Sequence, residues 1–287
     1  MTAVLKHELR SYFHSMTAWL FCAFLLLFVG IGSMLYNIQS AVANFEYVLK
    51  FVCIALVVIV PILTMKVIAE EKKQKTDQLL YSLPLKTSQV ILGKYLALLV
   101  IFAVPMAIVS LYPLIFARFG DVYLPTSYGS LIAFFFMGAA LIAIGTFISS
   151  LTENLGFAIG ISVAVLLLNY YCVTLADYIS STVLGSMIAL VVILLVLALI
   201  VRHVTGNDNL AFGIAMVGLL ALALIYFLNN SLFEGLLPTI MSGISLFERF
   251  YDFVNGVFDI TSIIFYLTVI VFFLFLSVQS MEKRRYN

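Results

Sequence analysis

Apolar stretches about as long as a membrane is thick dominate this sequence. A helix needs about 20 mostly apolar residues to cross the hydrocarbon core of a bilayer. Backbone polar groups cannot stay unpaired in lipid, so such stretches predict helices. The 287 residues contain eight of them, and 183–202 and 210–228 are the least distinct because only a short polar stretch separates them. The expected spans are 17–36, 48–68, 95–116, 130–151, 156–175, 183–202, 210–228 and 261–280.

The composition supports a membrane protein. Hydrophobic residues make up 64% of the chain and charged residues only 10%, whereas soluble domains are about 45–50% apolar and about 25% charged. A soluble chain could not bury so much apolar surface. The alternating ten-residue segments that are typical of membrane β-barrels do not occur in the sequence. We therefore predict an all-α integral membrane protein with about eight transmembrane helices.

Basic residues are divided unequally between the two sets of loops. If the N-terminus lies inside, only Lys50, Arg118 and Arg249 of the 15 basic residues fall outside, which leaves 12 on the inner side. Short cytoplasmic loops carry an excess of Lys and Arg, so we expect both termini in the cytoplasm. The net charge of +1 gives no indication of a nucleic-acid partner.

Three segments outside the predicted spans have distinctive sequences. Residues 1–16 place apolar side chains at helical spacing and suit a cytoplasmic amphipathic helix lying in the membrane interface; a plain charged lead-in to the first span is the alternative. Residues 229–260 mix four acidic residues with apolar ones and predict short extracytoplasmic amphipathic helices. Residues 66–94 are the longest charged connection on the cytoplasmic side.

Side chains that would support catalysis or ion coupling are scarce. The predicted spans hold almost no ionisable residues at depth, whereas proton-coupled and ion-coupled carriers need such groups. His7-Glu8 begins like a zinc-binding helix, but Ser11 stands where the second histidine should be. Ser88 replaces the first glycine of a phosphate-binding loop that would end at Lys94. We therefore expect no enzyme activity, no catalytic or metal-binding residue and no bound cofactor in this chain.

The 66–94 segment is the most informative part of the sequence. The preceding span can continue as a helix through Glu70 and Glu71. A short amphipathic helix then follows, and Pro84 ends it because the proline ring excludes continuation. Such a helix can seat in a groove of a soluble partner; a solvated loop is the alternative, and it leaves an exposed apolar cluster unexplained. The apolar side of the helix is made by Leu79, Leu80 and Leu83.

Several strings in the sequence occur together in one known family. They are AEE at 69–71, TDQLLYSLP at 76–84 and LGKY at 92–95, with LKHELRSYF at 5–13, AIGTFISSLTEN at 143–154 and the run 247–259. In this order they resemble ABC-2 type transporter permeases, most closely those of gliding-motility-associated ABC transporters. The resemblance covers about 1–175 and 246–287. Two features depart from it: Lys75 stands where the family often has glycine, and the family plan has six spans.

The resemblance implies a six-span core with 183–228 inserted as an extra helical pair, so that residues 17–287 form the permease domain. It implies that 76–84 is the coupling helix that docks on a separate ATP-binding subunit, and we call residues 66–94 the coupling segment. Glu70 and Glu71 would extend the lever to this helix. The implied coupling helix includes Thr76, Asp77, the docking residues Leu79, Leu80 and Leu83, and Pro84.

The partners also follow from the resemblance. It implies a second permease subunit, identical or different, with two ATPase subunits beneath the pair, in the cytoplasmic membrane of a bacterium. ATP would bind in the partner and not in this chain. An accessory subunit with an extracytoplasmic domain is also compatible with the resemblance. Gly156 and Gly160 have the spacing of a close helix–helix contact, either within the chain or between chains.

The spans favour an apolar translocation path, which suits a lipid-like or hydrophobic peptide-like substrate. We therefore expect the permease subunit of an ABC-2 exporter. Two alternatives remain: a non-transporting membrane anchor that relays ATPase motion to a cell-envelope or gliding complex, and an independent carrier or channel. The polar side chains expected on the path include Ser149, Ser150, Asn169, Tyr170 and Tyr171.

Overall fold

The computed structural model describes residues 2–76, 86–178, 183–205 and 208–286. Every element in these ranges is a helix, and no strand forms there. The helices fall into two compact units, one made of Met1–Tyr170 with Leu246–Asn287 and the other of Tyr171–Ser245. The prediction of an all-helical protein is therefore confirmed for the part of the chain that the structure describes.

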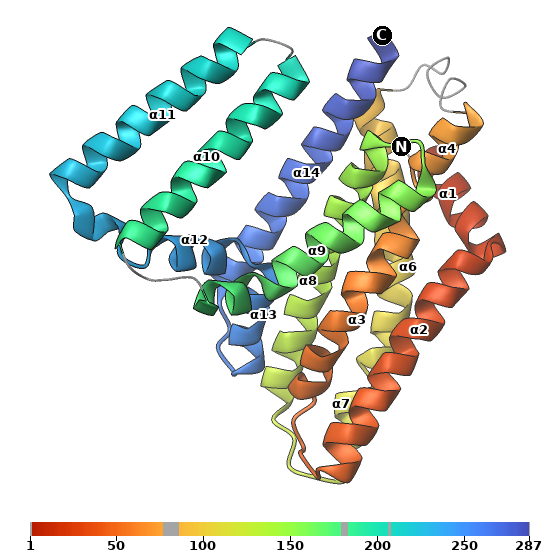
Figure 1. Ribbon diagram of the computed structural model, residues 1–287. Helices are drawn as coiled ribbons and strands as arrows, with labels where there is room; N and C mark the ends of the chain where they lie inside the picture. Colours follow the sequence, from red (N-terminus) through yellow and green to blue (C-terminus); the bar gives the residue numbers. More distant parts are fainter. Residues whose placement is uncertain (1, 77–85, 179–182, 206–207, 287) are drawn as a thin grey trace. The chain divides into compact units, whose positions relative to one another are not determined.

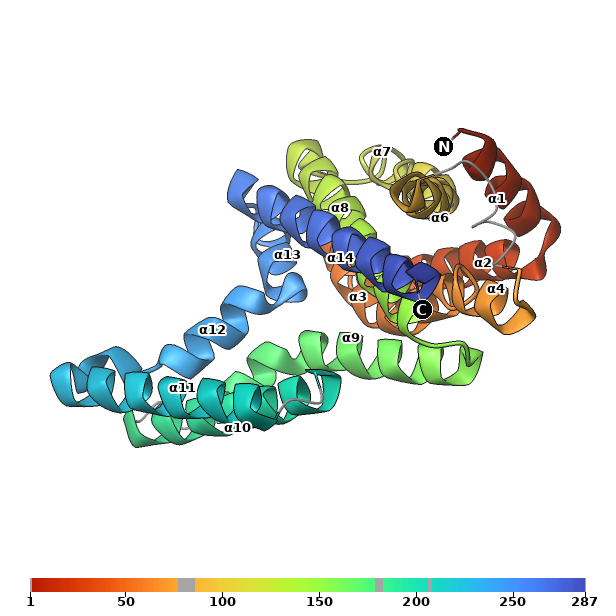
Figure 2. The same cartoon turned by 90° about the horizontal axis from the view of Figure 1, so that it is seen from above.

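The first unit surrounds one long, mostly buried helix, α8 (Leu124–Leu151). The helices α3, α6, α13 and α14 pack against α8, as Figures 1 and 2 show, and α4 and α7 also contact it. Besides α8, the unit contains α1 (Thr2–His14), α2 (Met16–Gly32), the π-helix η1 (Ser33–Gln39), α3 (Glu46–Thr64), α4 (Ala69–Gln74), α6 (Thr87–Val109), α7 (Tyr112–Phe116), the greater part of α9 (Leu155–Tyr178), α13 (Leu246–Val254) and α14 (Ile260–Tyr286).

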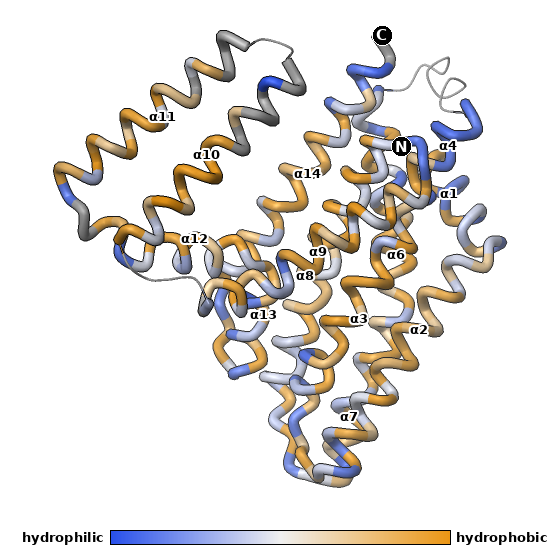
Figure 3. The backbone as a smooth tube through the Cα atoms, viewed as in Figure 1, coloured by the Kyte–Doolittle hydropathy of each residue, from blue (hydrophilic) through white to orange (hydrophobic). Residues whose placement is uncertain are grey.

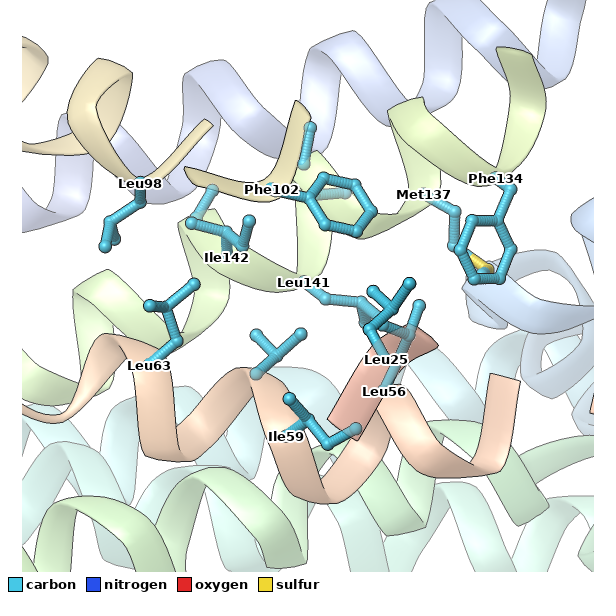
Figure 4. Close-up of a cluster of buried hydrophobic side chains, with 14 of the residues drawn as sticks. Leu25, Leu56, Ile59, Leu63, Leu98, Phe102, Phe134, Met137, Leu141 and Ile142 are labelled. Atoms are coloured by element: carbon cyan, nitrogen blue, oxygen red, sulfur yellow. The ribbon is translucent and has the colours of Figure 1, made fainter. Parts of the chain in front are cut away.

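Small residues allow α8 to lie at the centre. A Cβ added at Gly145 would overlap the side chain of Thr64 in α3, and one added at Gly138 would overlap the ring of Phe102 in α6. Glycine has no side chain, so the neighbouring helices can approach closely at these two positions. Apolar side chains fill the remaining space (Figure 4). The buried cluster includes Leu25, Leu56, Ile59, Leu63, Leu98, Phe102, Phe134, Met137, Leu141 and Ile142.

The second unit consists of a helical pair followed by short helices. In the 183–228 region, α10 (Val183–Thr205) and α11 (Asp208–Leu228) pack along each other. Gly218 of α11 faces Leu194 of α10 so closely that an added Cβ would overlap the leucine side chain. After this pair come the 3-10 helix η2 (Asn230–Phe233) and α12 (Leu236–Ile244), both of which contact α10.

Among the described residues, six helical stretches, some of them made of two consecutive helices, are long and apolar enough to cross a membrane. The apolar parts described in α10 and α11, Val183–Leu195 and Ala215–Leu228, are shorter, so the count of eight spans stays a prediction. Figure 3 shows apolar residues along the middle of the first unit and polar residues at its two ends. The six are Met16–Gln39, Glu46–Gln74, Thr87–Phe116, Leu124–Leu151, Leu155–Ala176 and Ile260–Arg284.

Gly145→Ala is expected to lower the free energy of unfolding by about 1–3 kcal/mol, because the added methyl group forces α8 away from α3. Gly160→Ala in α9 is the matched control: nothing lies within 4 Å of a Cβ at that position, and alanine is the better helix former. Thermal unfolding of the purified chain in detergent measures both variants. Equal stability of the two would contradict the close contact between α3 and α8.

Candidate functional site

The two ends of the coupling segment lie at one end of the first unit, near α1 and the C-terminal part of α14 (Figure 1). We call this the basal end. Glu70 and Glu71 belong to α4, and Thr76 follows that helix. The predicted docking face therefore stays a prediction, because the remaining predicted coupling residues lie outside the described ranges. These residues are Asp77, Leu79, Leu80, Leu83 and Pro84.

The helix α4 ends in a left-handed turn at Lys75. Its φ angle is 58°, and its N–H donates to the carbonyl of Lys72. The N–H of Thr76 donates to the carbonyl of Glu71 at 3.0 Å. These two bonds form a Schellman motif, in which the left-handed position favours glycine. Lys75 therefore occupies a position where glycine would be free of strain.

A buried ion cluster joins the coupling segment to two other helices. The ammonium of Lys94, in α6, donates to Glu8 of α1 at 2.7 Å and to Glu71 of α4 at 2.5 Å. The exposed fractions of the three side chains are 1% for Lys94, 11% for Glu8 and 24% for Glu71. One cation thus pairs with two carboxylates, so both ends of the coupling segment and the N-terminal helix share one electrostatic contact.

The phenol of Tyr12 lies beside this cluster. Tyr12 is buried on the same face of α1 as Val4 and Glu8, and its hydroxyl has no hydrogen-bond partner among the described residues. Burial, and next the negative charges of Glu8, Glu70 and Glu71, raise the pKa of Tyr12 well above its ordinary value. The side chain therefore stays a neutral phenol throughout the physiological pH range.

The C-terminal end of α8 receives two further contacts at the basal end. The carbonyl of Ser150 accepts hydrogen bonds from the ammonium of Lys72 in α4 and from the hydroxyl of Ser280 in α14. A cation is favourable there because the last carbonyls of a helix carry partial negative charge. Beyond α8, Arg284 pairs with Glu153 and holds the pKa of that exposed carboxyl below its ordinary value. Both α4 and α14 are thereby attached to the central helix.

The second span does not continue unbroken into α4. Its helix ends at Thr64, residues 65–68 form turns, and α4 begins at Ala69. Ser149 of α8 lies in this break: its hydroxyl accepts from the N–H groups of Ile68 and Ala69 and donates to the carbonyl of Met65. The prediction of a continuous helix through Glu71 is therefore wrong at 65–68, because a side chain from α8 takes over the backbone hydrogen bonds.

Four of the polar residues expected along a translocation path make contacts inside the first unit. Ser149 and Ser150 are fully buried, with the partners just described. The amide oxygen of Asn169 accepts from the N–H of Leu246, and the ring of Tyr170 meets that of Phe247 edge-on. These side chains hold the helices together. Tyr171 belongs to the second unit.

Gly156 and Gly160 have open surroundings. A Cβ added at Gly160 would meet nothing within 4 Å, and one at Gly156 would meet only the amide oxygen of Asn154, two residues earlier. The predicted helix contact is therefore not made by a neighbour within the described residues, and a contact with another chain stays a prediction. Among those residues, no three His, Cys, Asp or Glu side chains lie close enough together to hold a metal ion.

A family model described as ABC-2 family transporter protein matches residues 29–176. The match spans more than half of the chain, from the end of α2 to α9, and it includes the coupling segment and Ser149. This chain belongs to the ABC-2 transporter family. The assignment confirms the broader resemblance, while the gliding-motility subfamily stays a prediction. No curated protein matches this ABC-2 chain.

Three charged residues of this ABC-2 chain have roles that its sequence alone did not reveal. Glu8 lies four residues from Val4 and from Tyr12, and this spacing puts it on the buried face of α1. The partners of Lys94 lie 86 and 23 positions away in the sequence. Glu46, at the opposite end of the unit, begins α3 as a buried carboxylate that accepts from the hydroxyl of Ser127 at 2.8 Å.

Lys94→Met is expected to lower the free energy of unfolding by about 3–5 kcal/mol, because two buried carboxylates lose their shared cation. Adding Glu8→Gln and Glu71→Gln removes those charges and should recover most of the loss. Arg284→Met is the control, since it breaks an ion pair that is largely exposed and should change little. Chemical or thermal unfolding in detergent compares the variants. A loss no greater in Lys94→Met than in Arg284→Met would contradict the cluster.

Lys75→Gly is expected to raise the free energy of unfolding by about 0.5–1 kcal/mol, because glycine adopts the left-handed conformation without strain. The matched control is Lys73→Gly, inside α4, which should be destabilising by a similar amount. The same unfolding assay measures both. If both variants are destabilised, the left-handed turn at Lys75 is incorrect.

Proposed function

We propose that this ABC-2 chain is the membrane-spanning subunit of an exporter, that a separate ATP-binding subunit docks on its coupling segment, and that a second permease subunit faces it. The buried polar contacts at the base of the coupling segment carry this proposal. A loop that only joins two spans has no need of a lysine at 1% exposure between two carboxylates, because loop charges can remain in water. A segment that transmits force needs firm attachment at its base.

The contacts at the basal end define where such a force would go. Glu71 passes a displacement of α4 to Lys94 and so to α6 and α1. Lys72 passes it to the carbonyl of Ser150 at the end of α8. Since α8 packs against α3, α6, α13 and α14, movement of its basal end reaches most of the first unit. Close-packed interiors transmit such displacements instead of absorbing them.

The same proposal fixes the orientation. An ATP-binding subunit works in the cytoplasm, so the basal end faces the cytoplasm, with α1 and the end of α14 beside it. The excess of basic residues in the loops of that side agrees with this orientation. The resemblance of the sequence to bacterial permeases leads us to propose the cytoplasmic membrane of a bacterium as its location.

For the substrate, we propose a lipid-like molecule or a hydrophobic peptide. Large apolar side chains are exposed along the spans, for example Phe24 in α2, Val104 in α6 and Phe272 in α14. The hydroxyls of Ser127, Ser130 and Ser149 bond within the first unit. A path along such surfaces offers little to a hydrated ion, which must replace its water ligands with polar groups.

Copurification tests the ATPase partnership. The tagged chain, extracted from its native membrane in mild detergent, should bring down an ATP-binding subunit in a stoichiometric amount. Leu79→Asp with Leu80→Asp should reduce that recovery at least tenfold, because two charges would enter an apolar docking face. The control is Phe119→Asp with Tyr123→Asp, which adds the same charge at residues that are 86% and 71% exposed on the opposite side of the membrane.

Two outcomes would contradict the proposal. A pure chain without any nucleotide-binding subunit would favour an independent carrier or channel. An ATPase complex that hydrolyses ATP in liposomes, yet moves no labelled lipid or hydrophobic peptide across them, would favour the membrane-anchor alternative.

A further inference from the structure

The break between α3 and α4 replaces two helical hydrogen bonds. In an uninterrupted helix, the N–H of Ile68 would donate to the carbonyl of Thr64, and that of Ala69 to the carbonyl of Met65. Here Val67 donates to Thr64 in a tighter turn, at 3.2 Å, and regular helical bonding resumes with Lys72 donating to Ile68. The backbone at Ile68 has left the helical region, with φ −128°.

The hydroxyl of Ser149 stands between the donor and the acceptor of one of these two bonds, the N–H of Ala69 and the carbonyl of Met65. It accepts from Ala69 N–H at 3.1 Å and from Ile68 N–H at 3.3 Å. It donates to the carbonyl of Met65, also at 3.1 Å. A side chain inserted into the hydrogen-bond ladder is a known cause of sharp helix bends. Ser149 comes from another helix, so the hydrogen bonds at the bend depend on a contact with α8.

We propose that residues 65–68 are a hinge and that Ser149 is the positioning residue that keeps it bent. When the hydroxyl withdraws, Ala69 N–H can donate directly to Met65, Ile68 N–H can donate to Thr64, and α3 and α4 join into one helix. The freed hydroxyl can donate to the carbonyl one turn earlier in α8, as that of Thr146 already does to Ile142. Both forms satisfy the same groups, which is what a two-state element requires.

The hinge and the ion cluster act on the same short helix. Glu71 and Lys72, both in α4, are attached to Lys94 and to the Ser150 carbonyl. Straightening at 65–68 redirects α4, so these attachments must break or move with it. The bent form is therefore held at three points, and force on the coupling segment can release them together. This role in a transport cycle rests on the proposed function; the hinge itself does not.

Spin labels test the hinge in the isolated chain. Labels at Lys73 in α4 and Ile132 in α8, both exposed, report the distance between α4 and the middle of α8 in nanodiscs by double electron–electron resonance. Ser149→Ala should shift the main distance by several ångströms. Ser150→Ala should leave it as in the wild type, because that equally buried hydroxyl donates only within α8, to Phe147, and its backbone carbonyl is retained.

A second variant keeps the test decisive if the alanine variant does not fold. Ser149→Gly also removes the hydroxyl and adds no thiol that a label could modify, so it should produce a shift similar to that of Ser149→Ala. Wild-type distances in every folded variant at Ser149 would overturn the hinge. So would equal shifts in the Ser149→Ala and Ser150→Ala variants.

The complex with an ATP-binding subunit tests the hinge in the cycle. Trapping with ATP and orthovanadate should move the wild-type distance towards that of Ser149→Ala and leave Ser149→Ala unchanged. An unchanged wild-type distance in a complex that hydrolyses ATP would overturn the role of the hinge in transport. If no ATP-binding subunit copurifies, the proposed function fails, and the isolated-chain measurement still decides whether the hinge exists.

Discussion

The close approach of α3 to α8 is the constraint on which the basal end depends. Gly145 leaves room for Thr64, and one turn further along α8 this brings the hydroxyl of Ser149 within reach of the backbone at 65–69. The next residue then offers its carbonyl to Lys72. A bulkier residue at position 145 would disturb the contact, the bend and the attachment of α4 at once, since all three lie within two turns of α8.

The fold follows from the sequence to the extent that hydropathy determines it. Long apolar stretches identified the spans because a membrane-spanning helix must hold all its backbone bonds within itself. The short helices before α14 followed from acidic residues that interrupt an apolar run. The bend at 65–68 could not be foreseen, because neither glycine nor proline stands there and the interruption comes from Ser149, 80 positions after Ala69.

The candidate site was only partly visible for a similar reason. Glu70 and Glu71 belong to a string that resembles a family motif, but the motif does not indicate which of the two carboxylates forms an ion pair. In the sequence, Glu8 and Lys94 each resemble an ordinary charge at a membrane boundary. In the structure they lie 2.7 Å apart, and both can be buried because their opposite charges are paired. In a chain with so few charges, a charge four residues from two apolar residues of one helical face is the signal that could have identified Glu8.

The basal end also dictates an order of assembly during synthesis. Lys94 lies 86 residues after Glu8, so Glu8 cannot form this ion pair until the third span begins to emerge from the ribosome. Ser280 and Arg284 close their contacts with the end of α8 about 130 residues after it has been made. The growing chain must therefore keep α1, α4 and the end of α8 available while later spans insert. The C-terminal turns of α14 complete the basal end last, so a chain released a few residues early would have all its spans but an open base.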